Sequence, residues 1–388
     1  MIIKTDNVLQ VFYAAVSIIV LFSGSFHPLY NWDIIPYIAS AKALGSNDPI
    51  LVHSFTYTEI DKSAGTRKYA SSSAQEDSSF RALMRSDYSA FSDLLLFYKV
   101  RVVYNLAVYS LLSVGIAPVF ATHFISAVSI FLATWMLFLI GRHSFSIPLQ
   151  FVILPLVLGL GAYKLARLST PDALAFLLVL AILYCFLKEH PAIYFLFPLL
   201  VAVRTDLLLL VVLLGLSLLF LKTPGIFATL VSLVISVSIF FLLEWVYSYP
   251  GWKAVFYFTF CDKSALTTPP EFGPDLYFPV FSEGIRSVLK SPQFFFFLAI
   301  IGLALFFSTY KLKGILVASK LKSKSVILLL TAIIYFIIRM IVFPLAETRF
   351  LVIPYTIAAI SFCELFSPVM TAFNRRDAAL DGLTSPPR

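Results

Sequence analysis

Long apolar stretches recur along the whole chain, and no other feature restricts its fold as strongly. Only a run of about 20 apolar residues is long enough to cross a bilayer as a helix. Such runs occupy 8–26, 118–141, 147–163, 172–187, 226–249, 292–310, 326–344 and 350–367. About a quarter of a soluble domain is charged, whereas 13% of these 388 residues are charged and 60% are hydrophobic. We therefore predict a single, all-α polytopic membrane domain spanning 1–388, surrounded by membrane lipids.

Basic residues orient the ends of this predicted bundle. The net charge is +8, and the clearest basic run is a short loop containing Lys311, Lys313, Lys320, Lys322 and Lys324. A short basic loop between two apolar spans marks the cytoplasmic side of a membrane, so this charge does not indicate nucleic acid. The loop at 250–291 is then expected outside, with 368–388 as a cytoplasmic tail.

Two segments allow alternative topologies. Residues 94–116 are apolar but contain Lys99 and Arg101, and residues 191–221 contain Arg204-Thr205-Asp206 at their centre. Either 94–116 lies along the outer interface and 191–221 forms a hairpin, or 94–116 spans and 191–221 crosses once. The single crossing places two charges near mid-bilayer, at about 2.5–3.5 kcal/mol each. We therefore favour the hairpin, with about ten spans and interfacial helices in a long first outer loop at 27–117.

In the hairpin topology, the ionisable residues near the spans gather on the non-cytoplasmic side. Charges in or next to membrane helices are costly and usually face an interior cavity, so each one is a functional-site hypothesis. The set comprises Asp33, Lys164, Arg167, Asp172, Arg204, Asp206, Glu244, Arg339, Glu347 and Arg349. For any single member, a structural ion pair or a charge reaching the membrane surface is the competing interpretation.

Several chemistries lack their motifs. The sequence has no Gly-rich phosphate loop, no G-x-S-x-G elbow and no His/Cys cluster at metal-ligand spacing. No cofactor or metal is therefore predicted. An outward-facing site would receive its activated group through the bilayer, most simply on a polyprenyl phosphate. Such a transfer needs a base for the acceptor hydroxyl and cations for the departing phosphate, and arginine suits phosphate oxygens.

Three short motifs resemble the GT-C superfamily of integral membrane glycosyltransferases, which use polyprenyl-phosphate-linked sugars. The first is Trp32-Asp33, followed by Tyr37 and the run Ile38-Ala39-Ser40-Ala41. The second is the segment from Arg167 to Asp172, which contains Pro171-Asp172, and the third is Arg349-Phe350-Leu351-Val352-Ile353-Pro354. The resemblance covers roughly residues 8–367. Asp33 has no neighbouring acidic residue, which departs from the family's paired acidic forms and leaves a divalent metal unsupported.

The resemblance implies a general base at Asp33. The donor phosphate is then expected to bind Arg339, Arg349, Arg204, Arg167 and Lys164, with Asp172, Asp206, Glu347 and Glu244 as orienting acids. Trp32, Tyr37 and Trp252 are candidates for stacking on sugars, although aromatic residues are common at membrane interfaces. The acceptor would be a glycan, lipid or protein outside the cytoplasm, which for a bacterial inner membrane is the periplasm.

Two other functions compete with this prediction. A transporter or flippase of lipid-linked saccharides would show internal repeats and broken helices near the midplane. A non-catalytic membrane subunit would use the same charges only for stability. The transferase is our leading hypothesis because the charges lie toward one surface.

Overall fold

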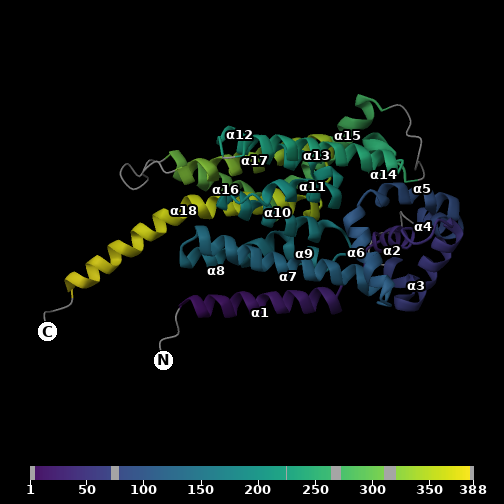
Figure 1. Cartoon of the computed structure of the whole chain (residues 1–388), viewed down its shortest axis with the longest axis horizontal. Helices are drawn as coiled ribbons and strands as arrows, with labels where there is room; N and C mark the ends of the chain where they lie inside the picture. The colour runs from purple at the N-terminus through teal and green to yellow at the C-terminus, as the bar shows by residue number, and fades with distance from the viewer. Residues whose placement is uncertain (1–4, 71–77, 224, 264–271, 310–319, 385–388) are drawn as a thin grey trace.

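The computed structural model describes residues 5–70, 78–223, 225–263, 272–309 and 320–384, and every regular element in these ranges is a helix (Figure 1). The long bundle contains α1(Thr5–Phe26), α7(Pro118–Ser144), α8(Ile147–Val157), η2(Leu158–Ala162), α9(Tyr163–Ala166), α10(Asp172–Lys188), α11(Ile193–Val203), η3(Thr205–Leu207), α12(Leu208–Phe220), α13(Ile226–Val246), α16(Pro292–Thr309), α17(Lys320–Val342) and α18(Thr348–Thr384). The other helices gather at one end: α2(Ile34–Lys42), α3(Pro49–Ala70), α4(Ser78–Ser86), α5(Tyr88–Lys99), α6(Val102–Ser113), α14(Gly251–Phe260) and α15(Pro274–Leu289). We call this the outer end.

The chain is a polytopic helical membrane protein. Six helices in the described ranges are long and apolar enough to cross a membrane, and two sharply bent helix pairs raise the number to eight at most. Our prediction of about ten such spans was therefore too high. The segment expected as two spans consists of α11 with 11 residues and α12 with 13 residues, because the backbone leaves the helical conformation at Arg204.

The helices α11 and α12 form the hairpin that the charges at its centre predicted. The start of α11 lies beside the start of α13, where the Ser232 hydroxyl donates to the Tyr194 carbonyl at 2.6 Å. Gly215 in α12 packs against Leu233 further along α13. The chain therefore runs toward the outer end through α11, turns at Arg204 and returns through α12.

The segment 94–116 does not cross the membrane as one helix. It is divided between α5 and α6, whose axes differ by 114°. Asp87 caps the start of α5 by accepting hydrogen bonds from the backbone N–H groups of Ser89 and Ala90. Helices α2, α3 and α5 share a small hydrophobic core of their own, which includes Ile38, Ile60 and Leu94. The first outer loop is therefore a folded helical layer at the outer end of the bundle (Figure 1).

Helix α18 is central, and a kink in its neighbour determines where it starts. Every residue from 351 to 361 is buried, as expected for a helix that is apolar on all sides. Between α8 and α9, Gly161 has a φ of 130°, a conformation that residues with a Cβ rarely adopt. Thr348 packs directly against this glycine. The kink therefore holds the first turn of α18 at the outer end, next to the loop that carries Asp33.

Candidate active site

Asp33 lies at the junction between α1 and the outer layer, immediately before α2. Its Oδ1 accepts a hydrogen bond from the Tyr98 hydroxyl at 3.0 Å, and its Oδ2 accepts one from the Asn31 amide at 3.0 Å. Arg349, 316 residues further along the chain, also donates to Oδ2. Since a carboxylate has about four acceptor positions, one position on Oδ1 remains for a further donor.

The surroundings of Asp33 keep it ionised. Burial by itself would raise the pKa of this carboxyl, but the charge and hydrogen bond of Arg349 outweigh that effect. The hydrogen bond from Tyr98 and the charge of Arg101 act in the same direction, so the pKa lies below its usual range. Only 18% of the Asp33 side chain is exposed. A charged carboxylate is thus held in a largely buried place at neutral pH.

Arg349 forms ion pairs with two carboxylates. Besides Asp33, it contacts Glu347, with 2.5 Å between Nε and Oε2. The Glu347 side chain is 46% exposed, whereas that of Arg349 is 19% exposed. The sequence segment Glu-Thr-Arg at the entry to α18 therefore supplies both a cation for Asp33 and a second, more hydrated partner for that cation.

Arg204 shows the same double pairing at the turn of the α11–α12 hairpin. It forms an ion pair with Asp172 at the start of α10, and these two side chains are 5% and 4% exposed. Arg204 also donates two hydrogen bonds to Asp206, at 3.0 Å from Nε and 2.6 Å from Nη2. Asp206 is 44% exposed. The buried pair connects the hairpin to α10, and the exposed partner faces open space.

Phe350 brings the two ion-pair clusters together. The guanidinium carbons of Arg204, Arg339 and Arg349 lie 5.2, 4.9 and 4.8 Å from the centre of its ring. Each distance is within about 6 Å, where a cation is attracted to an aromatic ring. Three arginines from the hairpin turn, α17 and α18 therefore converge on one side chain.

Arg339 differs from the other two arginines because it has no carboxylate partner. It donates to the backbone carbonyl of Phe343 at 2.9 Å and stacks on the Phe343 ring at 5.0 Å. Within the described residues it forms no ion pair, and it is only 8% exposed. Its charge is balanced at longer range, chiefly by Asp206. Arg339 is thus a buried cation with hydrogen-bonding capacity to spare.

Arg101, which we did not predict as a site residue, is a second cation of this kind. Its guanidinium lies over the rings of Tyr98 and Tyr37, 5.2 and 5.7 Å from their centres, and donates to the Phe97 carbonyl at 2.7 Å. It has no ion-pair partner in the described part of the chain. The available signal was a lone arginine in an apolar segment, which we considered only as a reason why the topology of 94–116 was ambiguous.

Three predicted residues lie apart from this cluster. Arg167 donates from Nε to the carbonyl of His27 at 2.8 Å and stacks on Tyr163. Lys164 is exposed. Glu244 is partly exposed on α13. Neither Lys164 nor Glu244 forms an ion pair within the ranges described. The predicted charged residues that do form the cluster are Asp33, Asp172, Arg204, Asp206, Arg339, Glu347 and Arg349.

The three aromatic candidates occupy different environments. Tyr37 is 3% exposed and packs edge-on against Tyr98 at 5.1 Å, so neither face of its ring is open to a ligand. Trp32 packs against Phe80 at 5.8 Å between ring centres. Trp252 is 38% exposed and anchored by a hydrogen bond from its indole nitrogen to a carbonyl at the end of α17. Trp252 therefore has the most accessible ring of the three.

No known protein family, curated protein or solved structure matches this chain. The chemical capacity of the site therefore has to be argued from its own residues. In the described part of the chain, no group of three or more His, Cys, Asp or Glu side chains is arranged to hold a metal ion. What the outer end does contain is an ionised carboxylate with one open acceptor position, close to two arginines without carboxylate partners.

Proposed function

We propose that this protein is a membrane glycosyltransferase that moves a sugar from a polyprenyl-phosphate donor to an acceptor hydroxyl at the outer end. The observation that carries the proposal is the convergence of Asp33 with four arginines beneath a folded outer layer. A base and phosphate-binding cations are the two requirements of such a transfer. The cluster lies toward one surface, which favours a transferase over a saccharide transporter with a site near the midplane.

The pairing pattern divides the arginines into two roles. Arg349 and Arg204 each hold two carboxylates, so they position the acids and retain little capacity for another anion. Arg339 and Arg101 are balanced only at longer range, and both act electrostatically on Asp206. Charge-assisted bonds from arginine to phosphate oxygens are among the strongest hydrogen bonds in proteins. We therefore assign the donor phosphate to Arg339 and Arg101.

The proposed reaction uses the open acceptor position of Asp33. The acceptor hydroxyl donates its proton to Oδ1 while its oxygen forms a bond to the anomeric carbon of the sugar. The bond between that carbon and the phosphate oxygen breaks, and the phosphate leaves with the electron pair. Arg339 and Arg101 stabilise the negative charge that develops on the phosphate. Tyr98 and Arg349 keep the carboxylate oriented throughout.

The orientation of the protein follows from its lysines. In the proposal, the helices of the long bundle run alternately toward and away from the outer end, and α11 and α12 form a short hairpin. Lys324 lies in the second turn of α17, at the end of that helix opposite to Arg339, and pairs with Glu189 just after α10. By the positive-inside rule, that end faces the cytoplasm. The site then faces outward, to the periplasm if the membrane is a bacterial inner membrane.

Asp33→Asn tests the role of the base. The amide cannot accept the proton, and loss of a general base costs about 10²–10⁴ in rate. The matched control is Asp61→Asn, because Asp61 is also in the outer layer but forms an exposed pair with Arg85. Each variant is expressed in cells lacking the gene, and lipid-linked and surface glycans are profiled by mass spectrometry.

We expect one glycan to be absent with Asp33→Asn and present with Asp61→Asn at equal protein abundance in the membrane. A glycan profile identical to wild type in cells containing Asp33→Asn would refute the base assignment. A loss of membrane protein in place of a loss of product would indicate a structural role for the carboxylate.

A further inference from the structure

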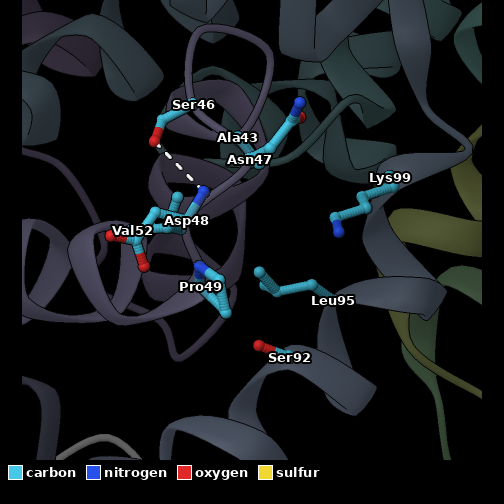
Figure 2. Close-up of a pocket in the computed structure, with 9 residues that line it drawn as sticks. All are labelled: Ala43, Ser46, Asn47, Asp48, Pro49, Val52, Ser92, Leu95 and Lys99. Atoms are coloured by element: carbon cyan, nitrogen blue, oxygen red, sulfur yellow. Dashed lines mark hydrogen bonds between the residues drawn. The ribbon is translucent and has the colours of Figure 1, made fainter.

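A polar cavity lies in the outer layer, separate from the cluster around Asp33. It has a volume of about 120 Å³ and lies between the connection from α2 to α3 and the later turns of α5 (Figure 2). Its apolar part includes Leu95, Val52 and Pro49, and Ser92 and Lys99 add polar groups from α5. Binding sites for small molecules commonly combine apolar walls with a few polar groups in this way.

Lys99 is the most informative residue of the cavity. Figure 2 shows its ammonium group directed into the open space between α5 and the α2–α3 connection. It is half-buried and forms no ion pair or side-chain hydrogen bond within the described residues. Burial lowers the pKa of this ammonium group below its usual value, as expected for a cation without a compensating anion.

The acidic residue that lines the same cavity does not neutralise Lys99. Asp48 Oδ1 accepts hydrogen bonds from the backbone N–H groups of Ile50 and Leu51, at 2.9 and 3.3 Å. It thereby caps the first turn of α3. Figure 2 shows its carboxylate turned away from Lys99. The cavity is therefore positive where Lys99 enters it and offers the hydroxyl of Ser92 nearby.

We propose that this cavity binds an anionic group, a carboxylate or phosphate, on a hydroxylated acceptor such as an acidic saccharide. This proposal rests on the transferase function. Helix α2 connects the two places: Asp33 precedes it and Ala43, which lines the cavity, follows it. Ten residues of helix correspond to about 15 Å. An extended acceptor would thus have one unit at Lys99 and its reactive hydroxyl at Asp33.

The test measures binding to the full-length protein in lipid nanodiscs by saturation-transfer NMR. The probes are methyl glucuronide, glucose 6-phosphate and methyl glucoside, which share a sugar ring and differ in charge; inorganic phosphate is added as a competitor. We expect binding of at least one anionic sugar and not of the neutral one. Lys99→Met should weaken that binding about tenfold or more, the effect of losing a hydrogen bond to a charged group.

Two further variants make the result specific. Ser92→Leu fills the cavity and should also abolish binding, whereas Lys253→Met removes an exposed lysine elsewhere in the outer layer and should have no effect. Absence of binding by both anionic sugars, equal binding of the neutral one, or binding unaffected by Lys99→Met would overturn the proposal. Complete displacement by inorganic phosphate at equal concentration would also overturn it, because the sugar ring would then contribute nothing.

The failure of this proposal is distinguishable from failure of the transferase. Asp33→Asn should keep anionic-sugar binding while losing the glycan product. If the product is lost but no anionic sugar binds, only the cavity assignment is wrong. If Asp33→Asn retains the product, the transferase role of Asp33 is wrong whatever binds at Lys99.

Discussion

Replacing Arg204 by methionine should destabilise the protein by about 3–5 kcal/mol, because it leaves a buried carboxylate without its cation. The carboxylate concerned is Asp172, whose side chain is 4% exposed. The other partner, Asp206, is 44% exposed and remains hydrated when the guanidinium is removed. Methionine retains apolar contact with Phe350, so the cost arises mainly from the uncompensated charge at Asp172.

Two further variants separate the buried pair from the exposed one. Arg204→Met combined with Asp172→Asn should recover most of the lost stability, since an amide has no charge to compensate. Asp206→Asn should cost less than about 1 kcal/mol, as expected for an exposed ion pair. The stability of each variant relative to wild type thus reports which carboxylate depends on Arg204.

The measurement is equilibrium unfolding in mixed micelles with increasing dodecyl sulfate, followed by the fluorescence of the four tryptophans. The reasoning is refuted if Arg204→Met is as stable as wild type. It is equally refuted if adding Asp172→Asn to Arg204→Met makes the protein less stable, because the charge at Asp172 would then not be the source of the cost.

Two other predictions follow from the geometry of the outer end. Arg349 lowers the pKa of Asp33, so Arg349→Met should raise that pKa and move the acidic limb of the pH–activity profile to higher pH; an unmoved limb would contradict our account. The lowered pKa of Asp33 also contributes to the free energy of unfolding. That contribution is complete at a pH above the pKa of Asp33 in the unfolded chain, and it is lost as the pH falls through the pKa of Asp33 in the folded protein. Gly161→Ala should cost about 1–3 kcal/mol and lower the melting temperature, because φ is positive there and Thr348 fills the space. Gly159→Ala is the control, since nothing lies within 4 Å of the added carbon.

Part of this arrangement could be predicted from the sequence because the underlying physics is local. The cost of placing Arg204 and Asp206 at mid-bilayer predicted the hairpin, and the structure confirms the turn at this position. The number of spans was overestimated because the same turn divides its segment into two helices too short for the usual crossing. We expected Arg204, Arg339 and Arg349 to lie near one another because the favoured topology puts all three at the same end of the bundle.

The pairing within the cluster was beyond sequence reasoning. Asp172 and Asp206 appear equivalent in the chain, yet one is buried and the other exposed, because that difference depends on how the hairpin packs against α10. Tyr98 and Arg101 occur in an apolar segment that resembles a membrane span. Only the sharp bend between α5 and α6 directs them toward Asp33, and composition does not encode that bend.

The ion pair between Asp33 and Arg349 has a consequence for biosynthesis. Asp33 follows α1, whereas Arg349 lies in the first turn of α18, 316 residues further along the chain. Until the ribosome has delivered α18, Asp33 lacks its ion-pair partner Arg349, and Arg204 and Arg339 lack the Phe350 ring. Nascent chains that have not yet reached α18 therefore lack this ion pair, and the cluster is completed only when α18 has been made.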